Sequence, residues 1–351
     1  LRYTLSAVLI SRKLNDRRAL AEASLLAAQF YNGIGDLKAA RAYGQSSLNL
    51  FQEQHNAEQT GQAYLLLWRV NVNSDVDDSV SIAILEKAAG AFHTSGNKIE
   101  EGGCYKELGD LLLIQGEVMA SFTSLRNSLS IFEQIKYPRT QGVYDLLGMA
   151  YLRMGDYKAA LASSLRAVAI AQQLGDTGVS LATYYNRLGS IYSKVKDPVR
   201  AELALRKGLA IDQQCRDTNG IFFLSYNIVA EMLNQSKAAE ALHFINTLRQ
   251  KYPTFQDQSY SGYNLLMIRM YTALGQYAAG EPYSKRIEDL ANEKELNDRL
   301  LPIFYNGLIP YHIGAGNWEK ATALALRYRK HAELNGNADA WSFSINVEAC
   351  A

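Results

Sequence analysis

Hydrophobic residues recur with helical spacing along most of the chain, and short polar turns interrupt them at regular intervals. The clearest examples are residues 144–172 and 185–213, in which two apolar-periodic segments flank one turn. Apolar residues three and four positions apart share one face of an α-helix and can be buried together. Each stretch therefore predicts a helical hairpin, two helices folded back on each other.

The turn sequence itself is repeated. Its best copy is GDYKAA at 155–160; other copies begin at Gly35, Gly116, Gly275 and Gly316, and weaker ones at Val76, Lys196 and Ser236. The turns near 35, 76, 116, 155, 196, 236, 275 and 316 are 39 to 41 residues apart. Glycine suits the left-handed end of a helix, and Asp or Asn after it caps the next helix. The pattern predicts an all-α fold, a solenoid of about eight hairpins forming a single domain over residues 1–351.

The first helix of the best hairpins carries a further motif. Residues 185–192 and 144–151 share it, and residues 105–109 carry its first half: Tyr185-x-x-Leu188-Gly189-x-x-Tyr192, Tyr144-x-x-Leu147-Gly148-x-x-Tyr151 and Tyr105-x-x-Leu108-Gly109. The motif resembles the tetratricopeptide-repeat pattern W-x2-L-G-x2-Y, with tyrosine in place of tryptophan. The resemblance implies a right-handed α-solenoid of tetratricopeptide-like hairpins. The period near 40 residues is similar to that of kinesin light chain, the Leu-Gly-Asn spindle adaptors, and Rap-type and PlcR-type peptide receptors.

Two sets of residues refine this expectation. Small residues recur in the second helices and allow close helix packing, but Leu248, Ile287 and Tyr328 replace them in repeats six to eight, where Pro310 also interrupts a helix. We therefore expect irregular packing there. The recurring tyrosines share one repeat position and are predicted to be core residues: Tyr64, Tyr105, Tyr144, Tyr185, Tyr226, Tyr263 and Tyr305.

Composition and charge restrict the function. With 36 Lys+Arg and 35 Asp+Glu the net charge is +1, which provides no global field for nucleic acid. No apolar run approaches the ~20 residues that span a bilayer, so we expect no direct membrane insertion. The three cysteines, Cys104, Cys215 and Cys350, are too far apart for a C-x2-C zinc site. The chain begins at Leu1 without a methionine, and it is interpreted as a piece of a longer protein.

No constellation of catalytic residues stands out in the sequence. The five histidines are never three or four positions apart, so we expect no metal site and no cofactor. The GxG sequences at 33–35 and 314–316 coincide with repeat turns and lack the continuation of a phosphate loop. The region is therefore predicted to be non-enzymatic, although an acid/base pair assembled only in space stays open.

The tetratricopeptide resemblance implies that the first helix of each hairpin lines a concave groove. The polar residues expected to face that groove as ligand-binding residues are Lys106, Asp145, Arg153, Asn186, Ser190, Lys194, Asn227, Glu231 and Asn306. Asparagine carries both donors and an acceptor, so Asn186 and Asn227 are predicted to bond to the backbone of an extended peptide, as in Rap-type receptors. The alternative is that each bonds within its own helix or to a neighbouring repeat. Whether Asn264 points into the groove stays open.

We therefore expect a recognition module that binds a peptide or protein segment. The array resembles the sensor regions of bacterial, Bacteroidetes-type signal-transduction histidine kinases, which implies an extracytoplasmic, periplasmic location; otherwise the cytoplasm is expected. The alternatives are a cytoplasmic quorum-peptide receptor, a structural scaffold that assembles, for example as a homodimer, and an enzyme with a dispersed site.

Overall fold

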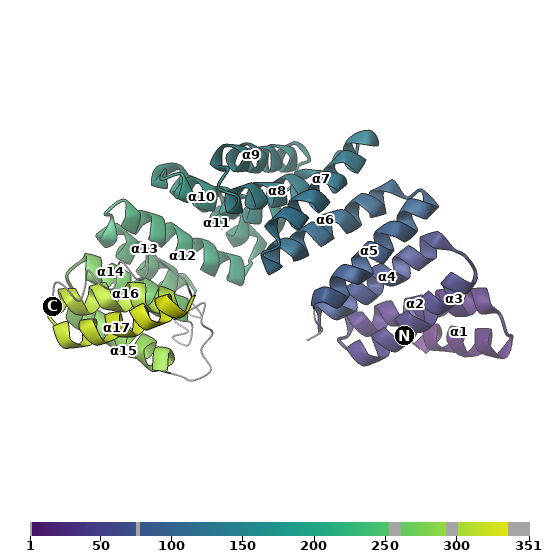
Figure 1. Ribbon diagram of the computed structural model, residues 1–351, viewed down its shortest axis with the longest axis horizontal. Coiled ribbons are helices and arrows are strands. Elements are labelled where there is room, and N and C mark those ends of the chain that lie inside the picture. The colour runs from purple at the N-terminus through teal and green to yellow at the C-terminus, as the bar shows by residue number, and fades with distance from the viewer. Residues whose placement is uncertain (1, 75–77, 253–260, 293–300, 336–351) are drawn as a thin grey trace. The chain divides into compact units, whose positions relative to one another are not determined.

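The computed structural model describes residues 2–74, 78–252, 261–292 and 301–335. Within these ranges the chain forms 17 α-helices and no β-strand (Figure 1). A first helix, α1 (Arg2–Lys13), precedes eight hairpins, which confirms the predicted all-α repeat fold.

The hairpins pair an even-numbered first helix with an odd-numbered second helix. They are α2 (Arg17–Gly33) with α3 (Leu37–Glu53), α4 (Ala57–Val72) with α5 (Asp78–Ser95), α6 (Lys98–Gln115) with α7 (Val118–Gln134), α8 (Gln141–Arg153) with α9 (Tyr157–Gln173), α10 (Val179–Lys194) with α11 (Pro198–Cys215), α12 (Thr218–Asn234) with α13 (Ala238–Lys251), α14 (Ser261–Ala273) with α15 (Tyr277–Asn292), and α16 (Leu301–Gly314) with α17 (Trp318–Asn335).

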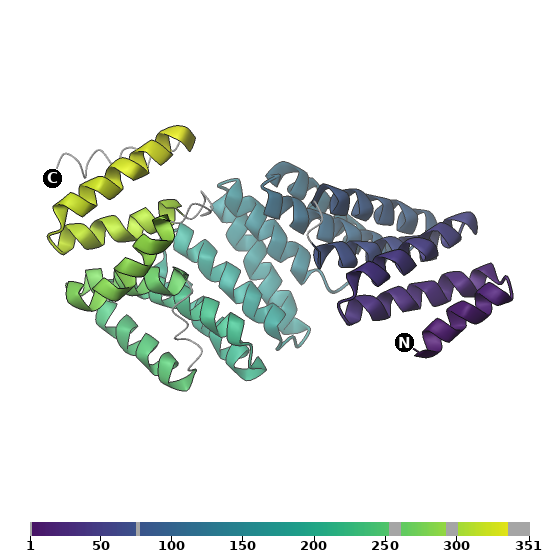
Figure 2. The same ribbon diagram turned by 90° about the horizontal axis from the view of Figure 1, so that it is seen from below.

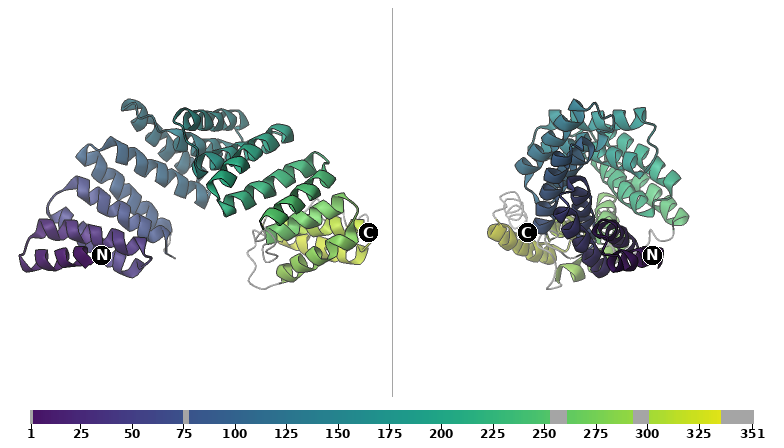
Figure 3. Two further views of the ribbon diagram at one scale, coloured as in Figure 1. Left: turned by 180° about the vertical axis from the view of Figure 1, so that it is seen from behind. Right: turned by 90° about the vertical axis from the view of Figure 1, so that its right-hand side faces the viewer.

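The chain divides into two compact units, Leu1–Asp176 and Thr177–Ala351. The first contains α1 to α9 and the second α10 to α17. Within each unit the helices follow one another side by side, purple to blue in the first and teal to yellow in the second (Figures 2 and 3). That both units form one domain stays a prediction. Among the described helices, none combines the length and apolarity that crossing a membrane requires.

Seven of the eight predicted turns adopt the left-handed conformation that the repeat pattern requires. The backbone φ is positive at Gly35, Gly116, Gly155, Lys196, Ser236, Gly275 and Gly316. The predicted turn at Val76 lies outside the described residues. Since every described turn contains a left-handed residue, the turn positions inferred from the sequence are confirmed.

A second series of left-handed turns precedes the first helices of the hairpins and was not predicted. Its members are Asn15, His55, Gly96, Lys136, Gly175 and Arg216. Asp16, Asn56 and Asn97 follow three of these turns, and each side chain caps the next helix by accepting a backbone N–H bond. First and second helices of hairpins can therefore both start with an Asx cap, as α4 and α9 do, and only the glycine-rich series is conspicuous in the sequence.

Small residues allow the paired helices to approach closely. A Cβ added at Gly189 would lie 2.7 Å from Leu205, which packs from the second helix of the same hairpin. The hydroxyl of Ser121 donates to the carbonyl of Gly109 at 2.6 Å, and the hydroxyl of Ser128 donates to that of Gly102 at 2.7 Å. The small side chains of the repeat pattern thus pack directly against backbone.

The later repeats replace small residues with buried large ones. Leu248, Ile287 and Tyr328 are 4%, 0% and 3% exposed, and Pro310 lies inside α16. Of the repeated tyrosines, Tyr185, Tyr263 and Tyr305 are buried, whereas Tyr64, Tyr105, Tyr144 and Tyr226 are half-buried against the core. The core assignment therefore holds fully at three of the seven positions.

Candidate functional site

The first helices form a shared face within each unit. In the second unit α10 packs beside α12, α12 beside α14, and α14 beside α16; in the first unit α2 packs beside α4 and α6 beside α8. We call these surfaces the first-helix faces. The polar positions expected to bind a ligand lie on these helices.

Asn186 and Asn227 are brought together on the first-helix face of the second unit. The Nδ2 of Asn227, on α12, donates to the Oδ1 of Asn186, on α10, at 2.8 Å. Both side chains are half-buried. Among the described residues neither amide has another side-chain bond, which leaves the Asn186 Nδ2 as a donor and the Asn227 Oδ1 as an acceptor. The pair joins two repeats and still presents both kinds of hydrogen-bonding group.

The other predicted residues of the second unit differ in accessibility. The hydroxyl of Ser190 donates to the Asn186 carbonyl of its own helix at 3.1 Å, while Lys194 and Asn306 are exposed. Glu231 is only 6% exposed, and the Nδ2 of Asn234 approaches its Oε2 at 3.4 Å. Glu231 therefore offers little surface to a ligand. Asn264 is fully buried, at 0% exposure, and does not reach the face.

The predicted residues of the first unit are largely engaged within the protein. Lys106 forms an ion pair with neighbouring Glu107 at 2.6 Å, and Asp145 is 3% exposed. The guanidinium of Arg153, on α8, donates to the backbone carbonyl of Leu113, on α6. This bond links two repeats in the same way as the asparagine pair. The first unit therefore provides fewer uncommitted polar groups at the predicted positions than the second.

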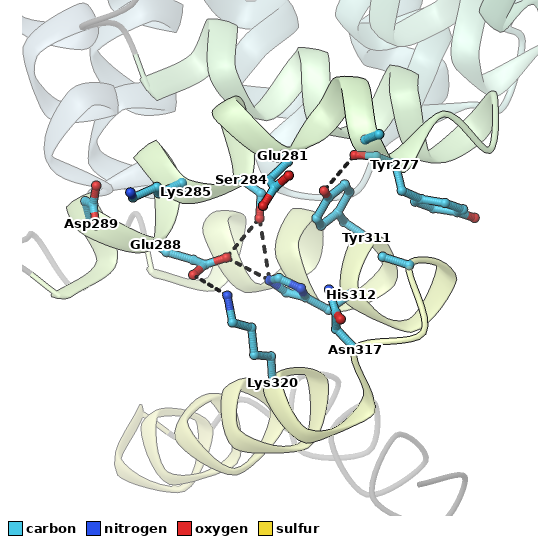
Figure 4. Close-up of a pocket in the computed structure, with 12 residues that line it drawn as sticks. Tyr277, Glu281, Ser284, Lys285, Glu288, Asp289, Tyr311, His312, Asn317 and Lys320 are labelled. Atoms are coloured by element: carbon cyan, nitrogen blue, oxygen red, sulfur yellow. Dashed lines mark hydrogen bonds and ion pairs between the residues drawn. The ribbon is translucent and has the colours of Figure 1, made fainter.

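A polar cavity that the sequence interpretation missed lies between the last two hairpins. It has a volume of about 550 Å³ and is walled by α15, the end of α16 and the start of α17 (Figure 4). At its centre the Glu288 Oε1 accepts bonds from the Ser284 hydroxyl at 2.9 Å and the His312 Nε2 at 2.8 Å. The Nζ of Lys320 lies 3.3 Å from the other oxygen, Oε2.

The charge states in this cavity follow from burial and pairing. Burial lowers the pKa of His312, and its ring is 2% exposed. Burial by itself would raise the pKa of Glu288, but the hydrogen bonds from Ser284 and His312 and the charge of Lys320 lower it. At neutral pH the carboxylate is therefore ionised and the imidazole is neutral with its proton on Nε2. The Nδ1 lone pair of His312 is buried and has no hydrogen-bond partner in the described structure.

The Ser284, His312 and Glu288 side chains do not form a catalytic triad. A triad requires the acid on one ring nitrogen and the nucleophile on the other. Here Nε2 faces both the Glu288 oxygen, at 2.8 Å, and the Ser284 hydroxyl, at 3.5 Å. The serine donates its proton to Glu288 and not to the ring. Among the described residues, no group of three or more His, Cys, Asp or Glu side chains is placed to hold a metal ion.

Comparison of equivalent positions in the repeats could have indicated this cavity. Counted from its turn, Glu288 occupies the position that buried Leu48, Leu129 and Leu209 occupy in other repeats. His312 replaces the second tyrosine of the motif, represented by Tyr192. Two core positions of one interface have thus become polar together. Only the structure shows that these two residues meet.

Comparison with known proteins identifies the repeat type. Residues 139–214 match the family model of the tetratricopeptide repeat. No curated protein matches the sequence.

Solved structures share the fold at low sequence identity. A signal transduction ATPase with a tetratricopeptide repeat sensor, from Pyrococcus horikoshii, is 12% identical with a TM-score of 0.65, over 94% of this chain and 50% of that one. Aspartyl phosphate phosphatase F from Bacillus subtilis is 13% identical with a TM-score of 0.61, over 84% and 76%. A Rap protein complexed with competence and sporulation factor is 13% identical with a TM-score of 0.57, over 97% and 90%.

These similarities concern the fold alone, and the chain spans half the length of the archaeal ATPase. Residues 139–214 match the tetratricopeptide repeat, and the described helices on either side of them continue the same hairpin pattern in an all-α fold.

Proposed function

We propose that this chain binds an extended peptide on the first-helix face of its second unit, where Asn186 and Asn227 bond to the peptide backbone. The observation that carries the proposal is the 2.8 Å bond between the two amides. It holds both side chains in fixed orientations and leaves one donor and one acceptor. A peptide unit offers the complementary carbonyl and N–H, so recognition would depend little on the peptide's side chains.

The surroundings of the pair support this role. Lys194 is exposed on α10, one turn beyond Ser190, and gives the face a positive charge toward the end of that helix. A related fold supports it further, because a Rap protein has been solved in complex with competence and sporulation factor. The competing interpretation is that the amide pair only joins α10 to α12. If the pair binds a peptide, removal of the amides lowers ligand affinity. If the pair only joins the helices, their removal changes stability alone.

The test begins with a peptide selected from a random-peptide phage library on the whole chain and then synthesised. Its Kd is measured by calorimetry for the wild type and for the double variant Asn186→Ala/Asn227→Ala. Loss of two hydrogen bonds is expected to raise the Kd about tenfold or more. N-methylation of the central peptide bonds is expected to weaken binding similarly.

The matched control is Asn246→Ala, because Asn246 is exposed on α13, the second helix of the hairpin that contains Asn227. It should leave the Kd unchanged. If the double variant lowers the melting temperature but binds the peptide as the wild type does, the amides only join the repeats and the proposal is wrong.

A second candidate function is that of the sensor region of a larger signalling protein. Its support is the fold shared with an ATPase whose tetratricopeptide repeats are a sensor. A histidine-kinase context rests on the sequence resemblance alone. Determination of the coding sequence beyond Ala351 tests it: a membrane segment and kinase core there would support it, and an unrelated domain would contradict it.

A further inference from the structure

We propose that the cavity between α15 and α17 binds a primary ammonium group on a short alkyl chain, such as the side chain of a lysine. This goes beyond the peptide-binding proposal, since the cavity uses none of the residues assigned to the peptide. Either proposal can therefore fail without the other.

The cavity wall has an excess of hydrogen-bond acceptors. His312 lines it, is 2% exposed, and has a buried Nδ1 with no partner in the described structure. Ala278 also lines it, and Pro282, which lies inside α15, has no N–H to donate to the Ala278 carbonyl. Ala278 is exposed, but the Nδ1 of His312 is buried, and an unsatisfied buried acceptor is costly. The ligand that best satisfies this wall is therefore one that only donates, and an ammonium group donates three bonds.

The charges of the cavity wall also favour an ammonium group. Glu288 is already paired with Lys320, at 3.3 Å, so this pair is neutral. Glu281, Asp289 and Lys285 also line the cavity, and within the described part of the chain no ion pair engages the first two. The unpaired charge is therefore −1. An anion would meet Lys285 but would also have to approach three carboxylates, whereas a cation neutralises the net negative charge.

The opposite part of the wall is suited to an alkyl stem. The rings of Tyr277 and Tyr311 pack edge to face, with centroids 6.0 Å apart. The Tyr311 hydroxyl donates to the Tyr277 carbonyl at 2.8 Å, which holds the ring in place (Figure 4). Aromatic faces stabilise both methylene groups and an adjacent ammonium. A lysine-like group thus finds acceptors at one end and aromatic surface along its stem.

The test uses two amines and an uncharged analogue. N-acetyl-lysine methylamide represents a lysine side chain, 1,5-diaminopentane a free amine, and N-acetyl-norleucine methylamide the same stem without the charge. Each is titrated into the full chain while imidazole nitrogens are followed by NMR; the His312 signals are assigned from their absence in His312→Gln. We expect at least one amine to shift the His312 Nδ1 signal and the norleucine analogue to leave it in place. The amine that binds more tightly identifies a peptide-borne or a free source.

Variants that keep the fold decide between this site and adventitious binding. Glu281 and Asp289 are exposed, so Glu281→Gln/Asp289→Asn should fold normally, and it is expected to weaken amine binding about fivefold or more. The control is Glu319→Gln, an exposed acid on α17 that does not line the cavity, and it should bind as the wild type does. The proposal is overturned if neither amine shifts the Nδ1 signal, if the norleucine analogue shifts it equally, or if both variants bind alike.

Discussion

Asp212 is a buried acid in an unfavourable environment. Its side chain is 2% exposed, its Oδ1 has no hydrogen-bond partner among the described residues, and its carboxylate lies against Gly220 at the start of α12. Burial, and secondly the charge of Asp217, raise its pKa from 3.8 to about 6. Because the folded pKa lies above the unfolded one, the folded protein prefers the protonated acid. Stability from this residue is therefore fully present below pH 3.8 and is lost as the pH rises to about 6.

Replacement of this acid should stabilise the protein at high pH. Asp212→Asn is expected to raise the free energy of unfolding at pH 8 by on the order of 2 kcal/mol, and the gain should vanish near pH 3.5. Urea denaturation at several pH values measures it. Asp78→Asn, which removes an exposed carboxylate, serves as the control and should show no such pH-dependent gain. An equal effect of Asp212→Asn at both ends of the pH range would contradict the interpretation.

At the scale of one helix, two adjacent glycines of α6 have opposite surroundings. A Cβ at Gly102 would lie 2.6 Å from the ring of Phe132, whereas a Cβ at Gly103 would meet nothing within 4 Å. Gly102→Ala is therefore expected to destabilise the protein by about 1–2 kcal/mol through overpacking. Gly103→Ala should stabilise it by about 0.5–1 kcal/mol, because alanine favours helix. Thermal melts of the two variants test the sign of each change. If both variants shift the melting temperature in the same direction, the contrast in packing between Gly102 and Gly103 does not explain their stability.

Helix caps give a second contrast between elements. The side chain of Asp156 accepts the Ala159 N–H at 3.0 Å and caps α9, while Glu117, at the start of α7, makes no such bond. Asp156→Ala is expected to lower the free energy of unfolding by about 1 kcal/mol, and Glu117→Ala should leave it almost unchanged. Glu117→Asp should raise it by a few tenths of a kcal/mol, because aspartate can cap the helix. Hydrogen exchange of the first-turn amides measures each change locally. Equal losses for the two alanine variants would show that capping does not explain the difference.

At the scale of the whole molecule, each repeat is stabilised mainly by its neighbours. The first unit contains four complete hairpins, α2 to α9, after α1. The fragment 1–176 is therefore expected to fold alone, with a helical circular dichroism spectrum and a cooperative melt. A fragment 1–154 lacks α9, whose Ala160 and Ser164 pack against Gly148 of α8, so it should melt at a lower temperature. If 1–176 is unfolded, the compact unit does not fold independently.

Local chemistry made most of the repeat architecture predictable. Helical periodicity, the turn glycines and the residue that follows each turn act within one hairpin, so they identified the eight hairpins and seven described turns without knowledge of contacts. The turns between hairpins were missed because residues such as His55 and Arg216 adopt the left-handed conformation there without the glycine that marks it. The pairing of Asn186 with Asn227 was left open, because a spacing of 41 residues does not give the direction of either side chain.

The sequence by itself thus determined the fold type, because helix propensity, capping and the hydrophobic period are local and recur in every repeat. Tertiary structure alone decided which polar residues remain available. It buried Asp145, Glu231 and Asn264, joined Asn186 to Asn227, and brought Glu288 of one hairpin to His312 of the next. The physical reason is that burial and hydrogen bonding depend on side chains from helices far apart in the chain, whose positions follow only when the hairpins stack.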